Sequence, residues 1–408
     1  MNAYSPLFSA TLTPVMPHAL ALAVEVATTA LAVAGLGYFA AALVAALSFL
    51  GMRRSALPAF APDVSILKSL KGLDPGMMEA FRSHCRQSYT GEYELLFGVS
   101  SADDPAAAAV NQLQREFPGH IIRLIECPER LGTNGKASTL AQLVPHARHD
   151  FLLVNDSDIT VRPRYLERVM AHFAPEAEKP GGKHVGLVTA LYRGRAHETI
   201  FSLLEALGIA TDFQAGVLLS RLVERGLRYG LGSTLALRRE ALEQIGGFAA
   251  LADQLADDYE LGARVVRAGY RVALSGEVVE TSVPAYDWHG FADHQLRWAR
   301  TVRDARPWGY AGLIVTHGLG WALVNVIASG LTPLSLWLLS LSFFLRLALA
   351  MAVGARVLGD HQVVRNLWLL PLRDAVAMGT WVAGFAGNAI VWRGERFELK
   401  GGRLRKAE

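Results

Sequence analysis

Two aspartates that directly follow an apolar run have the spacing for metal chemistry. The run Phe151–Val154 is short and unbroken, which predicts a strand buried on both faces of a parallel sheet. Such sheets bind ligands at the carboxyl ends of their strands. Residues i and i+2 point the same way in an extended chain, so Asp156 and Asp158 can bind one divalent cation that holds a diphosphate. The alternative is that these residues only begin a turn.

Two further acidic pairs lie where loops should follow strands. Asp103 and Asp104 come directly after a predicted strand, where a carboxylate could accept hydrogen bonds from a base or a ribose. Alternatively, the Asp-Pro step only starts the next helix. Asp257 and Asp258 open a predicted helix. Neighbouring carboxylates repel, which raises one pKa and makes a better general base near neutral pH. Alternatively, they only cap the helix and complement its dipole.

A basic helix and a glycine-rich loop complete the candidate site. His294, Arg297 and Trp298 share one helix face by their i, i+3, i+4 spacing. A guanidinium beside an indole suits a diphosphate leaving group or a polar headgroup at a membrane surface. The alternative is a basic helix that only touches anionic lipid. Asn134 and Lys136 lie in a glycine-rich loop before the central strand, which is a weaker signal because such loops are common turns.

One α/β domain over residues 55–308 should position these side chains. Strand-like runs alternate with helical patterns, which predicts βαβ units and a mostly parallel, Rossmann-like sheet. The predicted strands are Val64–Leu67, Tyr93–Val99, Ile121–Ile125, Phe151–Val154, Gly186–Leu191 and Tyr270–Leu274. The predicted helices include Ala107–Glu116, Arg164–Phe173 and Asp257–Ala268.

The N-terminal segment predicts a membrane anchor over residues 1–54. Thr28–Met52 carries no charge and is long enough to cross a hydrocarbon core. Arg53 and Arg54 follow at once, whereas residues 1–27 contain no Lys or Arg, so the N-terminus should lie outside and the domain in the cytoplasm. A cleaved signal peptide would instead have basic residues before a shorter apolar region.

The C-terminal third, residues 309–391, predicts further membrane segments. Three apolar stretches occur at Ala311–Ser329, Leu331–Val353 and Leu367–Val391. Three full spans would put the tail outside, yet the tail 392–408 has six Lys or Arg against three Glu and should stay in the cytoplasm. We therefore expect the third stretch, which contains Pro371, Arg373 and Asp374, to be re-entrant or interfacial. Phe201–Leu222 also carries charges and predicts an amphipathic helix on or near the membrane.

Composition excludes other classes of protein. A hydrophobic fraction of 51% with 19% charged residues is too apolar for an ordinary soluble enzyme of 408 residues. The net charge of +3, without a stacked-aromatic and basic pattern, gives no case for nucleic acid binding. Cys85 and Cys127 form no cluster, which argues against a disulfide framework or a zinc site.

These motifs together resemble membrane glycosyltransferases of the GT-A fold, and within them the ceramide glucosyltransferase family. That family has three acidic motifs followed by (Q/R)-x-x-R-W before the C-terminal membrane segments, and the resemblance covers about residues 28–404. Ser69 replaces a usual proline, and His294 stands where Gln or Arg is expected. The matching stretches are Val64–Gly72, Asp103–Ala106, Asp156–Asp158, Asp257–Tyr259, Arg297–Trp298, Trp392–Gly394 and Phe397–Leu399. Three stretches look close to a bacterial branch that includes hopanoid glycosyltransferases, namely Tyr192–Gly194, Gly230–Arg239 and His294–Arg300.

The resemblance implies an inverting transferase in the bacterial inner membrane. It would move glucose or N-acetylglucosamine from a UDP-sugar to a hydroxyl of a membrane lipid, ceramide-like or hopanoid. It implies Asp258 as the base with Arg297 and Trp298 catalytic, and Mg²⁺ or Mn²⁺ on Asp156 and Asp158. The nucleotide-sugar contacts would be Asp104, Asn134, Lys136, Asp156 and Asp257, while His294 stays an uncertain acceptor residue. A polysaccharide synthase and a non-catalytic membrane scaffold are the alternatives.

Overall fold

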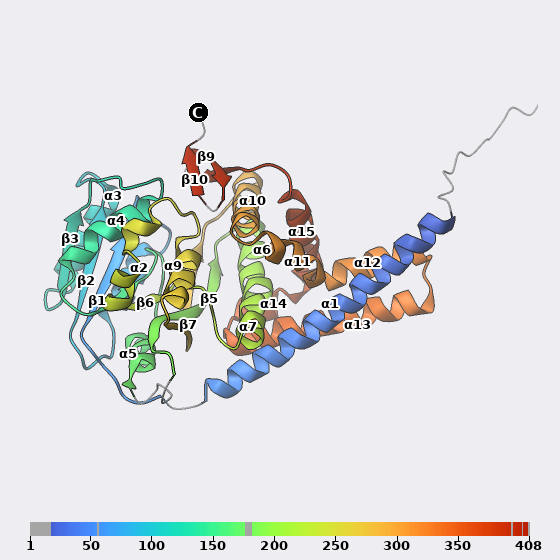
Figure 1. The fold of residues 1–408 in the computed structure, drawn as a ribbon, viewed down its shortest axis with the longest axis horizontal. Coiled ribbons are helices and arrows are strands. Elements are labelled where there is room, and N and C mark those ends of the chain that lie inside the picture. Colours follow the sequence, from blue (N-terminus) through green and yellow to red (C-terminus); the bar gives the residue numbers. More distant parts are fainter. Residues whose placement is uncertain (1–17, 55–56, 176–181, 393–394, 402, 407–408) are drawn as a thin grey trace, which may run out of the picture.

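A mixed seven-stranded sheet forms the centre of the computed structural model, which describes residues 18–54, 57–175, 182–392, 395–401 and 403–406. The strand order is β3-β2-β1-β4-β6-β5-β7. Figure 1 shows this sheet with its helices as one lobe, from which long helices extend to one side. The strands are β1 (Val64–Ser69), β2 (Tyr93–Val99), β3 (Ile121–Glu126), β4 (Phe151–Val154), β5 (Val185–Ala196), β6 (Leu235–Arg238) and β7 (Arg271–Val283).

The predicted mostly parallel sheet is confirmed, with one reversed strand. β1 pairs in parallel with both β2 and β4, so these three strands end at the same edge. β6 runs antiparallel to β4 and β5. The sequence does not predict β6, because its four residues carry no alternation of apolar and polar side chains. β7 continues well beyond the predicted 270–274, and this length brings its far end to the loop after β4.

Helices cover the sheet and connect its strands. Those of the domain are α2 (Met77–Cys85), α3 (Pro105–Glu116), α4 (Gly135–Leu143), α5 (Tyr165–Met170), α8 (Arg239–Gln244), α9 (Asp257–Arg267) and α10 (Trp288–Ala305). α5 continues as a single 3₁₀ turn to Phe173. One large core of buried apolar residues runs from the sheet into the long helices, because Phe39 and Phe49 are buried together with Ile66 and Leu153.

Three helices within the described residues are long and apolar enough to cross a membrane: α1 (His18–Met52), the continuous helix Ile200–Val223, and Pro333–Val357. Ile200–Val223 comprises α6 (Ile200–Gly208), a π-helical turn η4 (Ile209–Phe213) and α7 (Gln214–Val223). In its most apolar window 72% of the residues are buried inside the protein, so protein contacts rather than lipid cover this helix. The predicted anchor over residues 1–54 includes residues 1–17, which lie outside the described residues.

The three predicted C-terminal segments differ from one another in the structure. The first is a pair of helical pieces, Pro307–Thr316 and Gly318–Ser329 (α12), bent by 61°. The second is α13 (Pro333–Ala350), extended by a π-helical turn to Val357. The third is not one helix, because α15 (Leu370–Ala383) is followed by strand β8 (Ala389–Trp392). Shorter pieces are α11 (Pro307–Gly312), α14 (His361–Arg365) and η8 (Leu367–Leu369).

Charged residues of the apolar helices are paired with one another. Arg346 of α13 is 3% exposed and donates to Asp374 Oδ1 at 2.8 Å and to Asp212 Oδ1 at 2.5 Å. Arg373 of α15 donates to Asp212 Oδ2 at 3.1 Å. Buried charges are tolerated when they are paired in this way. These ion pairs therefore hold α13, α15 and the turn η4 together.

Two glycines allow α1 and α12 to cross closely. A Cβ atom built on Gly35 would lie 2.2 Å from the Cα of Gly318. Small residues permit such backbone approach between membrane helices. Figure 1 shows α1 lying along α12 and α13.

We expect Gly35→Ala to lower the unfolding temperature of the protein in detergent. The new methyl group must push two backbones apart, and overpacking of this kind costs about 1–3 kcal/mol. Gly37→Ala on the same helix is the matched control, since a Cβ there meets nothing within 4 Å. Equal melting temperatures for the two variants would contradict the close crossing of α1 and α12.

Candidate active site

A buried polar network fixes the start of the loop after β4. Asn155 donates to the carbonyl of Ser233 at 2.6 Å and to the hydroxyl of Tyr165 at 2.9 Å. Its Oδ1 lies 3.1 Å from Nε2 of His84. Lys68 of β1 is buried and donates to the main-chain oxygen of Asp156 at 3.0 Å. Burial lowers the pKa of Lys68 to about 7 although two nearby aspartates oppose it. Bonds from the buried Lys68 and Asn155 side chains therefore fix the loop that carries Asp156, and the sequence alone does not indicate either of them.

Asp156, Lys136 and Asp258 come together although they are far apart in sequence. Nζ of Lys136 forms an ion pair with Oδ1 of Asp156. Asp258 Oδ2 accepts from the main-chain N–H of Gly232 at 2.7 Å. A Cβ on Gly232 would lie 3.1 Å from Asp258 Oδ2 and 3.6 Å from Asp156 Oδ2. The two carboxylates thus approach the same glycine, and any larger side chain there would fill the space beside them.

The surroundings of Asp257 and Asp258, the acidic pair of α9, raise the pKa of both carboxyl groups. Burial raises the pKa of Asp257 to about 6, and the carboxylates of Asp258 and Asp156 add to this while Lys136 opposes it. Burial likewise raises the pKa of Asp258, against the effects of Lys136 and of the two backbone N–H groups that it accepts from. A carboxylate with a raised pKa binds a proton more readily, which is the property a general base requires near neutral pH.

Asp158 is tied to β7. Its Oδ2 accepts from the hydroxyl of Thr281 at 2.5 Å and from the N–H of Ser282 at 2.9 Å. Burial raises its pKa, and the carboxylate of Asp156 contributes. The long β7, whose length the sequence does not predict, therefore orients the second aspartate of this pair.

The described residues include no group of three or more His, Cys, Asp or Glu side chains that could hold a metal ion. Mg²⁺ is commonly bound by one or two carboxylates together with substrate phosphates. Oδ2 of Asp156 faces the space beside Gly232, and Asp158 lies near enough for the Asp156 carboxylate to raise its pKa. These donors fit an ion that arrives with a diphosphate better than one held by the protein alone.

Two predicted nucleotide contacts act as helix caps in the structure. Asp104 accepts from Ala106 N at 2.9 Å, which caps α3, and from Gly72 N at 3.0 Å. Asn134 is buried, caps α4 and donates to the carbonyl of Gln254 at 2.8 Å. The alternative reading of Asp104 as the start of a helix is thus confirmed. Contacts of both residues with a nucleotide remain predictions.

The helix α10 brings His294 against α6 and Trp298 against η4. Nδ1 of His294 lies 2.8 Å from Glu205 Oε1 on α6, and its ring is 5.7 Å from that of Trp298. Trp298 also packs edge-on against Phe213 at 5.6 Å between ring centroids. Arg297 lies near Tyr286. Burial raises the pKa of Tyr286, and the positive charge of Arg297 opposes this rise. The predicted shared helix face is confirmed for His294 and Trp298.

A three-stranded antiparallel sheet, absent from the sequence analysis, packs beside the acidic pair of α9. It consists of β8, β9 (Glu395–Lys400) and β10 (Arg403–Lys406). Ile390, Phe397 and Leu399 bury Leu255, which lies three residues before Asp258. Residues 393–394, part of the tail motif, lie outside the described residues. A cavity of about 350 Å³ is lined by residues of this sheet, of α9 with the loop before it, and of α10.

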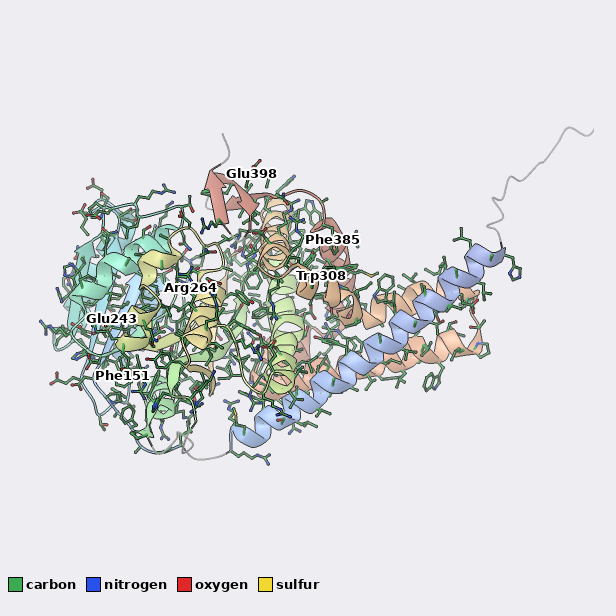
Figure 2. All side chains as sticks on the ribbon, viewed as in Figure 1. Phe151, Glu243, Arg264, Trp308, Phe385 and Glu398 are labelled. Carbon is green, nitrogen blue, oxygen red and sulfur yellow. The ribbon has the colours of Figure 1, made fainter. Side chains whose placement is uncertain are left out.

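We expect Phe397→Ala to reduce catalytic turnover and thermal stability together. Removing the ring leaves a cavity beside Leu255, which costs about 3–5 kcal/mol for a buried Phe and loosens the loop before Asp258. Glu398→Ala is the matched control, because Glu398 is the exposed neighbour on the same strand (Figure 2). If both variants turned over like the wild type, the sheet would have no part in holding this loop.

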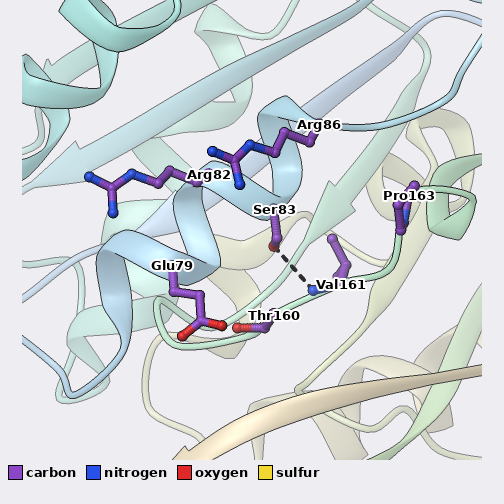
Figure 3. Close-up of a pocket in the computed structure, with 7 residues that line it drawn as sticks. All are labelled: Glu79, Arg82, Ser83, Arg86, Thr160, Val161 and Pro163. Carbon is purple, nitrogen blue, oxygen red and sulfur yellow. Dashed lines mark hydrogen bonds between the residues drawn. The ribbon is translucent and has the colours of Figure 1, made fainter.

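A second cavity, of about 520 Å³, lies away from the acidic residues. Figure 3 shows that Glu79, Arg82 and Ser83 of α2 line one side together with Arg86, which directly follows the helix. The loop at Thr160 and Val161 lines the other side. Ser83 Oγ accepts from Val161 N at 3.1 Å across it. Because Asp156, Asp158 and Asp258 do not line this cavity, we do not place the chemistry there.

Comparison with known proteins decides the family. A sequence profile described as glycosyl transferase family 21 matches residues 27–405. The chain belongs to glycosyl transferase family 21. The expected resemblance to the ceramide glucosyltransferase family is thereby confirmed, because curated relatives in this family carry that name.

Two relatives of this family 21 chain match along most of its length. Ceramide glucosyltransferase 3 of Caenorhabditis elegans is 25% identical over 84% of this chain and 73% of its own. Ceramide glucosyltransferase 1 of the same organism is 22% identical over 85% and 74%. Among solved structures, the mannosyltransferase PcManGT from Pyrobaculum calidifontis, in complex with GDP-Man and Mn²⁺, has a TM-score of 0.50 at 20% identity, covering 88% of this chain and 97% of its own. This likeness confirms the GT-A type of fold.

Proposed function

We propose that this family 21 protein transfers a sugar from a UDP-sugar to a hydroxyl group of a membrane lipid, with inversion at the anomeric carbon. The observation that supports it best is the approach of Asp156 and Asp258 to the same glycine, Gly232. The helix α10 lies close by and packs through Trp298 against Phe213 of η4. The relatives named ceramide glucosyltransferase support a lipid acceptor.

Each cluster residue has a role in this proposal. Asp258, with its raised pKa, takes the proton of the acceptor hydroxyl as its oxygen attacks C1 of the sugar. Lys136 and Asp156 lie across from Asp258, and the diphosphate binds beside them. Arg297 and Trp298 of α10 close over the diphosphate. Mg²⁺ or Mn²⁺ on Asp156 and Asp158 would stabilise the charge that develops on the departing UDP oxygen. A single displacement of this kind inverts the anomeric centre.

Exposed tryptophans support a membrane surface next to the site. Trp308 of α11 is 90% exposed, and Tyr310 of the same helix packs against Phe385, which follows α15, at 5.1 Å between ring centroids. Trp288 and Trp368 are also exposed, on α10 and η8. Tryptophans are enriched at the headgroup level of bilayers. We therefore infer that α10, α11 and η8 lie at the interface, with the catalytic domain over residues 55–308 in the cytoplasm as Arg53 and Arg54 predict.

A product assay tests this function. Purified protein is incubated with labelled UDP-glucose, UDP-N-acetylglucosamine or UDP-galactose and a host lipid extract, and the labelled lipid is identified by mass spectrometry. We expect one sugar on one lipid. A polymeric product would identify a polysaccharide synthase instead, and absence of any labelled product with all three donors would contradict the proposal.

A further inference from the structure

Glu205 and His294 form a pair that the proposed reaction does not yet use. Glu205 is 5% exposed, and its two carboxylate oxygens lie 2.8 and 2.9 Å from Nδ1 of His294. A carboxylate can only accept, so it holds the proton of the imidazole on Nδ1. In the neutral ring Nε2 is then a hydrogen-bond acceptor. No partner for Nε2 occurs in the described part of the chain.

Neighbouring side chains hold the imidazole in one orientation. Tyr286 stacks on it with 5.3 Å between ring centroids and 28° between ring planes, and Trp298 lies on another side. Gln295 donates to Glu205 at 3.4 Å and accepts from Arg373 at 3.0 Å. A ring fixed in this way presents Nε2 in a constant direction, as recognition of a specific group requires.

The pair lies between the acidic cluster and the membrane-side helices. Arg373 belongs to α15, which packs against α6, α10 and α12. On the other side, burial raises the pKa of Tyr192, and the carboxylates of Asp258, Glu205 and Asp156 each raise it further. Tyr192 is thus near both Glu205 and the proposed base. In the proposed reaction, the lipid hydroxyl reaches Asp258 from the bilayer. The headgroup atoms next to this hydroxyl then lie close to the Glu205–His294 pair.

We propose that Nε2 of His294 accepts a hydrogen bond from a second hydroxyl of the lipid acceptor. This inference rests on the proposed transfer to a lipid and makes His294 a residue that determines acceptor specificity, with Glu205 as its positioning residue. The favoured acceptors are lipid alcohols with a second donor near the reacting hydroxyl. A diacylglycerol lacks such a donor, because its other two oxygens are esterified. It would leave a fixed acceptor atom unpaired, which is costly once water is excluded.

A pair of matched lipids tests the assignment. The acceptors are a ceramide and the same ceramide with its second hydroxyl replaced by hydrogen, presented to the full-length protein in mixed micelles with saturating UDP-sugar. We expect wild-type kcat/KM to favour the intact ceramide by about tenfold or more, the usual size of one lost hydrogen bond in a desolvated site. In His294→Leu this ratio should fall to about one. His294→Gln, which carries an amide oxygen and a residue that the family pattern allows, should keep a ratio above that of His294→Leu.

The ratio of the two rates separates this role from a structural one, because general damage to the fold lowers both rates alike. Equal ratios in the wild type, His294→Leu and His294→Gln would overturn the assignment of His294 while leaving lipid glycosylation intact. Failure of the wild type to glycosylate either ceramide or any lipid of a host extract would overturn the proposed function, and this assignment with it.

Discussion

Asp258→Asn is expected to bind the UDP-sugar but to transfer it about 10²–10⁴-fold more slowly than the wild type, the usual contribution of a general base. The amide has nearly the shape of the carboxylate and can still accept from Gly232 N or from Tyr259 N. It cannot take up the proton of the acceptor hydroxyl. Loss of kcat with retained donor binding is therefore the specific result that a base predicts.

Two measurements and one control make this expectation decisive. Steady-state transfer gives kcat, and the rise in unfolding temperature on adding UDP-sugar and Mn²⁺ reports donor binding. Glu260→Gln is the matched control, because Glu260 lies on the same helix but pairs with Arg264 and Arg267. The control should transfer like the wild type. Unchanged turnover in Asp258→Asn would remove this residue from the role of base.

The position of the acidic residues follows from sequence because the topology of a parallel sheet requires it. Asp104 and Asp156 follow β2 and β4, which both pair in parallel with β1, so their loops necessarily meet at one edge. Asp258 is less constrained by sequence. It reaches the cluster through Gly232 N, which precedes the reversed strand β6, and a four-residue antiparallel strand carries no periodic signal.

The parts that the sequence does not predict depend on contacts distant along the chain. Lys68 has the one long charged side chain in the apolar strand β1, and such a residue could have indicated a buried partner. Its bond to the main chain of Asp156 cannot be predicted from sequence spacing. In the sequence Glu205 is one of the charges within the apolar stretch Phe201–Leu222, and its spacing does not indicate that it pairs with His294. The tail sheet escapes prediction because its strands are short and rich in charge, and because contacts distant along the chain hold it in place, namely the apolar cluster around Leu255 and the bond from Arg300 to the carbonyl of Ala389.

Removal of divalent metal should abolish transfer, and Asp156→Asn should prevent its restoration. The metal stabilises leaving-group charge by several kcal/mol, so we expect roughly a 10³-fold loss in excess EDTA and recovery with Mn²⁺ in the wild type. In Asp156→Asn the metal loses one negatively charged ligand. Lys136 also loses its ion pair, so its ammonium group is left unneutralised next to the metal site.

Direct Mn²⁺ titration distinguishes this explanation from general damage. Because the described residues offer two neighbouring carboxylates rather than a closed set of ligands, wild-type Mn²⁺ binding should be weak alone and at least about tenfold tighter with UDP present. Asp156→Asn should lose this enhancement. Asp150→Asn, at the other end of the same strand and 93% exposed, should keep it. Full activity of the wild type in EDTA, or an unchanged Mn²⁺ titration in Asp156→Asn, would show that the loop after β4 does not bind a catalytic metal.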